Sequence, residues 1–175
     1  MASVIMVAMG EDANPIDDPA DAAALAAYAS DLADALVAAL PGWVERAVAD
    51  RYRRWRDEDP PAAVEAAGAA AAAQSVVEVE GSLRALLAQD PDEQRTNPLA
   101  ILRRAVRHPT AVLRAAGVPP VARDPHAERL FPDDDYDLTP GAFADLDPTL
   151  HEPGLTWGAA KAHVILARRR AEGRR

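Results

Sequence analysis

The run of aspartates around residue 135 is the densest group of candidate metal ligands in the chain. Asp133, Asp135 and Asp137 match the first three ligand positions of a calcium-binding loop. Such a loop also needs a glycine and a bidentate glutamate, but Leu138 and Ala144 stand at those two positions. The coordination shell would therefore be incomplete. We interpret the run as a solvated acidic loop that leads into a helix start, and we expect no metal site.

Histidines are the next side chains that could bind a metal or transfer protons. The chain has four of them, at His108, His126, His151 and His163. No two have the i, i+4 spacing at which a helix presents two zinc ligands on one face. His151 and His163 flank a tryptophan-containing turn, and two aspartates precede them. With Asp145 or Asp147 they define an alternative hypothesis, an enzyme or small-ligand-binding protein with a site between an arm and a bundle.

Motifs for covalent or nucleotide chemistry are missing from the sequence. The chain has no cysteine, so it has no disulfide, thiolate metal ligand or thiol nucleophile. Its serines lack the G-x-S-x-G pattern of a nucleophile elbow, and neither a G-x-G-x-x-G nor a G-x-x-x-x-G-K run occurs. We therefore predict no catalytic residue and no cofactor, and we regard an enzyme as the less favoured alternative.

Clusters of arginine are the remaining feature that could bind a ligand. Residues 51–59, RYRRWRDED, mix aromatic and basic side chains, but helical spacing places Tyr52 and Trp55 on an apolar stripe. The net charge of −9 disfavours non-specific nucleic-acid binding. We therefore predict a protein partner, with nucleic-acid binding through arginine patches as a second alternative. The predicted partner-binding residues are Arg103, Arg104, Arg107, Trp157, His163 and Arg168.

Prolines that follow a helix-capping residue divide the chain into segments. Proline is tolerated at the first helical position, and an Asp, Asn or Thr before it can accept backbone hydrogen bonds. We interpret seven such pairs as helix starts. They are Asp18-Pro19, Asp59-Pro60, Asp90-Pro91, Asn97-Pro98, Asp124-Pro125, Thr139-Pro140 and Asp147-Pro148.

Apolar residues three or four positions apart support helices between these starts. One stripe runs over 25–40 and is expected to end at Pro41-Gly42, a second over 42–58, and a third over 76–87. Two short helices are expected after Asn97, broken at His108-Pro109 and ended by Gly117. The last helix carries apolar residues at 157, 160, 164 and 167 and ends among arginines.

The fold predicted from these elements is an all-α, single-domain helical bundle with an extended proline-rich arm in its C-terminal half. We divide the chain into a flexible N-terminus (1–17), a helical domain (18–171) and a tail (172–175). Within the domain, residues 18–95 form a long-helix bundle and 96–171 hold short helices, the arm and a C-terminal helix. Residues 132–153 carry seven acids and no base between two basic segments. This charge segregation predicts internal ion pairs, or alternatively a bipolar surface for a partner.

The first residues, MASVIMVAMG, lack the basic start of a secretory signal, so we expect a cytoplasmic protein. The uncharged stretch at 66–77 is shorter than the roughly 18 residues needed to span a bilayer, so we expect no membrane partner. The oligomeric state is left open. From Asn97 onward the segments NPLAILRRAVRHPTAVLRAAGVPPVARDPHAERLFP and YDLTPGAFADLDPTLHEPGLTWGAAKAHV resemble a family of short helical proteins from high-GC bacteria, a family of unknown function. The resemblance implies no activity.

Overall fold

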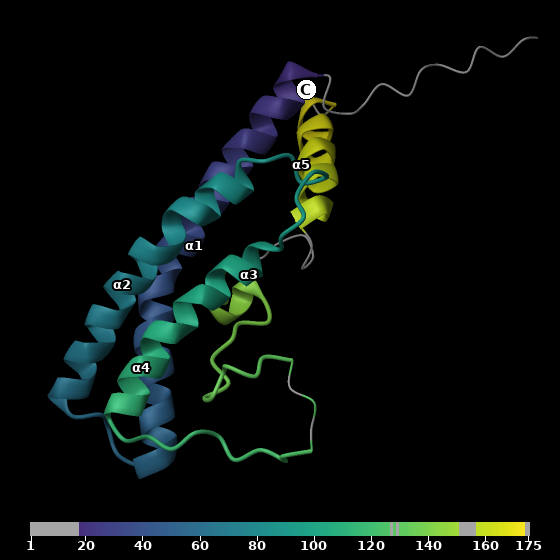
Figure 1. Cartoon of the computed structure of the whole chain (residues 1–175). Coiled ribbons are helices and arrows are strands. Elements are labelled where there is room, and N and C mark those ends of the chain that lie inside the picture. Colours follow the sequence, from purple (N-terminus) through teal and green to yellow (C-terminus); the bar gives the residue numbers. More distant parts are fainter. Residues whose placement is uncertain (1–17, 127, 129, 151–156, 174–175) are drawn as a thin grey trace, which may run out of the picture.

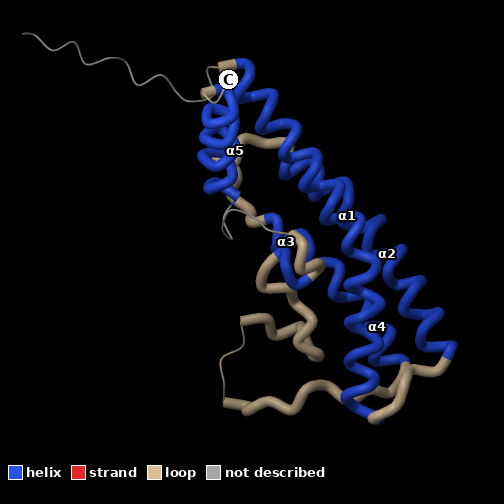
Figure 2. The backbone as a smooth tube through the Cα atoms, turned by 180° about the vertical axis from the view of Figure 1, so that it is seen from behind, coloured by secondary structure: helices blue, strands red, loops and turns tan. Residues whose placement is uncertain are grey.

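The computed structural model describes residues 18–126, 128, 130–150 and 157–173, and these contain helices but no strand (Figures 1 and 2). This confirms the predicted all-α bundle. The helices are α1 (Pro19–Arg56), α2 (Ala62–Leu87), α3 (Pro98–Leu102), η1 (Arg103–Val106), α4 (Arg107–Ala115), η2 (Phe143–Asp145) and α5 (Trp157–Glu172). The predicted flexible N-terminus lies outside the described residues.

Helix α1 is the long axis of the molecule. It packs against α2 along most of its length, against α5 beside its N-terminal half, and against α4 beside its C-terminal half (Figure 1). Helices α3, η1 and α4 follow one another in a single line that also covers α2. Two layers result, with the arm and η2 joining α4 to α5 on one side (Figure 2).

The expected stop at Pro41-Gly42 is wrong, because α1 continues through both residues to Arg56. A proline inside a helix loses one backbone hydrogen bond and crowds the preceding turn, at a cost of about 3 kcal/mol. Leu40 before the proline and Val44 after it are both fully buried in one core. Burial of apolar side chains on both sides of Pro41 outweighs the local cost, so the two predicted helices are one.

Asn97-Pro98 and Asp18-Pro19 start helices as predicted: Asn97 accepts from the Leu99 N–H and Asp18 from the Ala20 N–H, each at 2.9 Å.

The other five proline pairs do not start helices. Helix α2 begins after Pro61 without a side-chain cap, and Asp59 instead pairs with Arg53. Asp90, Asp124 and Asp147 make the same bond to the N–H two residues later, but there it closes a turn. Thr139 precedes a loop, and η2 begins at Phe143.

The break expected at His108-Pro109 lies earlier, in the 3-10 turn η1, and Pro109 sits in the first turn of α4. A proline cannot donate to the carbonyl four residues before it, which here is that of Ala105. The Ser75 hydroxyl of α2 lies 3.5 Å from that oxygen and 2.8 Å from the Ala71 carbonyl. Buried Ser75 therefore supplies a donor near the position that the proline leaves open.

Helix α4 ends at Ala115, and Gly117 stops it as predicted. Gly117 has φ +77°, its N–H donates to the Arg114 carbonyl, and the Val118 N–H donates to the Leu113 carbonyl. These two bonds form a Schellman motif, with Val118 packed against Leu113. The chain then continues into the predicted arm.

The core has two parts. The larger lies between α1, α2 and α3, and Phe143 and Leu146 of the arm close it. The smaller joins Val48 and Tyr52 of α1 to Leu113, Val118 and Tyr136. The Tyr136 hydroxyl donates to the Val118 carbonyl at 2.8 Å. Apolar side chains at both ends thus anchor the arm to the bundle.

Helix α5 differs from prediction in the face that it buries. Ala160 is buried as expected, but its buried neighbours are Lys161 and Ile165, and Ala167 is exposed. The Lys161 ammonium lies 2.6 Å from the Asp92 carboxylate and 3.3 Å from that of Asp90. Two acids in the α2–α3 connection therefore make a charged residue acceptable in this interface.

Candidate functional site: an arginine-lined cleft

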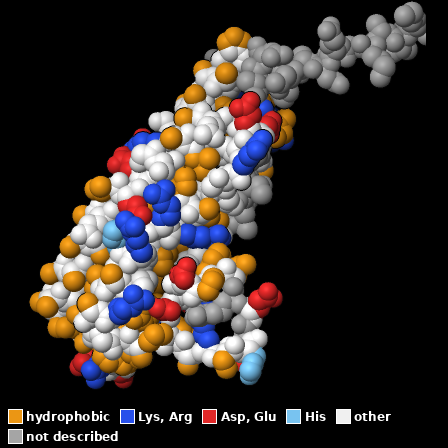
Figure 3. Space-filling model, in the orientation of Figure 1, with side chains coloured by type: hydrophobic (Ala, Val, Ile, Leu, Met, Phe, Trp, Pro, Cys, Tyr) orange, Lys and Arg blue, Asp and Glu red, His pale blue; other side chains and the backbone are white. Residues whose placement is uncertain are grey.

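A cleft of about 680 Å³ separates η1 and α4 from the arm. Arginine side chains dominate the helical wall, and basic groups gather near the middle of the face shown in Figure 3. On the helical side the lining residues are Arg103, Arg104, Val106, Arg107, Thr110, Ala111 and Arg114, with Glu78 of α2. On the arm side they are Leu130, Phe131, Pro132, Asp133, Asp134 and Thr139. The cleft thus has a cationic wall and an apolar and acidic wall.

Glu78 organises the end of the cleft next to α2. Its side chain is only 9% exposed, and its carboxylate lies 2.7 Å from the Arg107 Nε and 2.5 Å from the His108 Nε2. Arg104 lies 3.9 Å from the same carboxylate and 3.3 Å from the Ser82 hydroxyl. A nearly buried acid is therefore compensated by two arginines and contacted by the His108 ring, and it holds all three side chains in place.

Arg103 differs from its neighbours. Its guanidinium lies over the Phe131 ring, 4.2 Å from the centroid, within the range of a cation–π contact. Its Nε is buried and has no hydrogen-bond partner, and within the described residues the side chain forms no ion pair. Arg103 is thus a cation covered by an aromatic ring and not by an acid.

Thr110 lies two helical turns after Arg103 in the same wall. It is 6% exposed, and its hydroxyl oxygen has no hydrogen-bond partner in the described part of the chain. Buried hydroxyls are normally paired, because an unmade hydrogen bond costs free energy. The wall therefore holds two unsatisfied polar groups.

The arm wall is fixed by Asp134, which is buried. Burial alone would raise the pKa of its carboxyl group, but hydrogen bonds from the Thr139 side chain and from the backbone N–H groups of Leu138 and Thr139 outweigh burial and lower the pKa. Arg114 of α4 reaches Asp135 at 2.9 Å, and Arg123 pairs with Asp137. The acidic run is therefore a folded turn, and within the described residues no three potential metal ligands come together.

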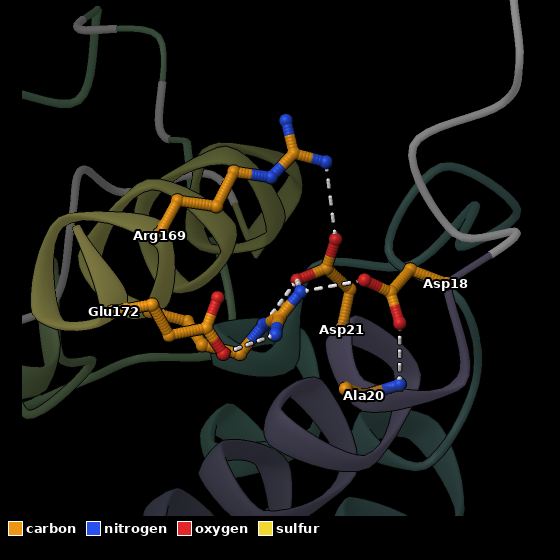
Figure 4. A network of polar contacts seen from close by, with 6 residues as sticks. Asp18, Ala20, Asp21, Arg169 and Glu172 are labelled. Atoms are coloured by element: carbon orange, nitrogen blue, oxygen red, sulfur yellow. Dashed lines mark hydrogen bonds and ion pairs between the residues drawn. The ribbon is translucent and has the colours of Figure 1, made fainter.

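The structure brings together three of the six predicted contact residues, Arg103, Arg104 and Arg107. Arg168 lies at the far end, where it binds the buried Asp21 together with Asp18 and Glu172 (Figure 4). His163 is exposed on α5. The side chain of Trp157 lies outside the described residues. The predicted contact residues thus do not form one surface.

The alternative site built on His151 and His163 gains no support. His151 lies outside the described residues. The Asp145 carboxylate accepts from the N–H groups of Gly141 and Ala142, and Asp147 binds the N–H and hydroxyl of Thr149. Hydrogen bonds of this kind lower the pKa of Asp147, so it is a poor base. Asp145 thus caps the start of η2, and Asp147 closes a turn.

The cleft lining includes residues that the sequence did not predict as contacts, among them Glu78, Thr110, Phe131 and Leu130. Glu78 lies about thirty residues from the arginines, and only the packing of α2 on α4 brings them together. A signal existed for Thr110, because with Arg103, Arg107 and Arg114 it follows helical spacing. No local pattern places Phe131 over Arg103.

Comparisons with known proteins add no relationship: no protein-family model, curated protein or solved structure matches the chain. One helix in the described residues, α1, is long and apolar enough to cross a membrane by length and composition. This is weak evidence, because the core helix of a soluble protein meets the same criterion. The expectation of no membrane partner was based on residues 66–77. The longer apolar helix is α1, because Pro41 does not interrupt it.

Proposed function

We propose that this is a non-catalytic, cytoplasmic interaction protein, an adaptor or regulator whose protein partner docks in the arginine-lined cleft. The observation that carries the proposal is the arrangement of Arg103, Arg104, Arg107 and Arg114 along one wall of a cleft of about 680 Å³. Arginine is enriched in protein interfaces, since its guanidinium combines apolar stacking with directional hydrogen bonds.

The rim of the cleft supports a protein partner further. Leu130 is 83% exposed there, next to the Phe131 ring. A large apolar side chain beside a cationic wall suits a partner segment that carries both apolar and polar side chains. A nucleic-acid backbone fits less well, because Glu78, Asp133 and Asp134 also line the cleft and would repel phosphates.

Site-specific photo-crosslinking tests this proposal with two closely matched positions. A photoreactive phenylalanine analogue would replace Leu130 at the cleft, or Val77 on the outer face of α2, which is 84% exposed. In cells that naturally produce the protein, we expect the analogue at 130 to give one reproducible protein adduct that the analogue at 77 does not give. The adduct should be excised and identified by mass spectrometry.

The same experiment in an Arg104→Gln, Arg107→Gln background shows whether the arginine wall is responsible. We expect the adduct at position 130 to be lost. Equal adducts at both positions, or an adduct that survives removal of both arginines, would contradict docking in this cleft. Circular dichroism of the doubly substituted protein checks that its helices remain.

A further inference from the structure

Resting on the proposed function, we infer that the occupant of the cleft is an acidic protein segment, one of whose carboxylates displaces the Phe131 ring from the Arg103 guanidinium. Phe131 is then a lid over the recognition group. The inference names the partner's chemistry and the residue that competes with it.

The other arginines of the cleft show what Arg103 lacks. Arg107 and Arg104 share the carboxylate of Glu78, and Arg114 reaches that of Asp135. Each therefore already has an acidic partner from this chain. Arg103 has none among the described residues and offers its planar fork of donors, which matches a carboxylate in a bidentate pair.

The covered state leaves polar groups unsatisfied. The Arg103 Nε and the Thr110 hydroxyl are both buried without a hydrogen-bond partner, and both residues line the cleft. The Phe131 ring provides a cation–π attraction but no acceptor atom for either donor. A carboxylate in the place of the ring would supply both charge and acceptor oxygens, so the exchange is favourable at Arg103.

The Phe131 ring can leave without unfolding the arm. Its backbone carbonyl accepts from the Asp134 N–H at 3.2 Å, and the turn that follows is held by the Asp134 carboxylate. Leu130, the residue before Phe131, is exposed. None of these contacts involves the Phe131 ring, so the ring could rotate off Arg103 without breaking them.

The charge of the cleft favours a carboxylate-bearing segment over a phosphate polymer. Its lining holds four arginines and three acids, so its formal excess is a single positive charge. One or two carboxylates neutralise that excess. A nucleic-acid strand would bring more negative charge than the lining can compensate.

Fluorescence anisotropy with the full chain tests the choice of occupant. The probe is a labelled eight-residue peptide of alternating glutamate and leucine, and the matched control peptide has glutamine for glutamate. We expect the glutamate peptide to bind more tightly than the control, and Arg103→Gln to weaken its binding roughly tenfold. Arg103→Lys, which keeps the charge but loses the fork, should weaken it as well.

Phe131→Ala tests the lid in the same assay. Because the ring no longer competes, we expect the glutamate peptide to bind roughly two- to tenfold more tightly. Phe131→Met keeps apolar bulk without the ring face and should change affinity in the same direction. Phe131→Met also keeps the test valid if the Phe131→Ala variant misfolds.

A second measurement needs no partner. Phenylglyoxal modifies accessible arginines, and the rate at Arg103 is followed by mass spectrometry, with exposed Arg95 as the internal reference. We expect Phe131→Ala to raise the rate at Arg103 severalfold without changing that at Arg95. An unchanged rate would overturn the lid.

The outcomes separate this inference from the proposed function. If the glutamate peptide requires Arg103 but Phe131→Ala binds it less tightly, the lid is wrong and docking in the cleft stands. If both peptides bind equally, or if an eight-nucleotide single strand binds more tightly than either, the acidic occupant is wrong. Crosslinking at Leu130 then still decides whether a protein docks there.

Discussion

The carboxylate of Asp134 accepts hydrogen bonds from the N–H groups of Leu138 at 2.9 Å and Thr139 at 2.7 Å. At the scale of single residues, this acid decides the form of the arm wall. Its neighbour Asp133 is exposed. The sequence shows both as members of one acidic run, and their different roles depend on which carboxylate faces backbone donors.

Asp134→Asn should destabilise the protein in a pH-dependent way. The pKa of Asp134 is lowered in the folded state, so its contribution is fully present above the unfolded pKa of about 4 and is lost as pH falls through the folded value. We expect the free energy of unfolding to drop by about 1–3 kcal/mol at pH 7, and the difference from wild type to shrink below about pH 4. Urea unfolding at several pH values measures this.

Asp133→Asn is the matched control for that substitution, and it should leave the stability at pH 7 unchanged. A difference between Asp134→Asn and wild type that stays constant down to pH 3 would show that the charge of Asp134 is not what holds the turn.

At the scale of elements, local sequence patterns correctly predicted a helix end that lies in a solvent-exposed turn. Gly117 ended α4 as predicted, because a residue with φ +77° strongly favours glycine. The helix interior at Pro41 did not follow local chemistry, because long-range burial on both sides of it decides the outcome. The proline pairs show the limit of local chemistry: the side-chain cap bond forms at five of the seven, but only those at Asp18 and Asn97 start helices.

Two glycine substitutions at matched positions test whether the positive φ of Gly117 is what ends α4. A methyl group at Gly117 or Gly81 would meet no other atom within 4 Å, so steric contact does not distinguish them. Gly81 lies inside α2, about two turns before its end, and Gly81→Ala should stabilise the protein by about 0.5–1 kcal/mol. Gly117→Ala should destabilise it by about 1–2 kcal/mol, because alanine is strained at positive φ. Thermal unfolding that gives the same sign for both would contradict the Schellman end.

At the scale of the whole molecule, ion pairs near both ends of α5 hold this helix against α1 and the α2–α3 connection. Asp21 is 1% exposed, and its carboxylate binds Arg168 and Arg169 of α5 (Figure 4). Buried Lys161 ties the same helix to Asp90 and Asp92. The acidic segment 132–153 also pairs internally, through Asp135 with Arg114 and Asp137 with Arg123, in line with one of the two interpretations of its charge.

Asp21→Asn should loosen α5 selectively. Removing one member of a buried ion pair leaves the other charge poorly compensated, at a cost on the order of 3 kcal/mol. We expect hydrogen exchange in residues 157–173 to accelerate while the exchange in α2 and α4 stays slow. Asp34→Asn is the control, because its pair with Arg84 is exposed to solvent and should contribute little. Uniform acceleration throughout the chain would contradict a local clamp.

The sequence by itself determined the helical class, the cap at Asn97, the end at Gly117 and the clustering of Arg103, Arg104 and Arg107. Each depends on contacts within a few residues, and periodicity and capping chemistry report such contacts directly. Only the tertiary structure decided that α1 passes through Pro41, that Glu78 anchors the arginine wall, and that Phe131 covers Arg103. These contacts join residues far apart in the chain, and their free energy comes from burial and charge compensation that no local pattern records.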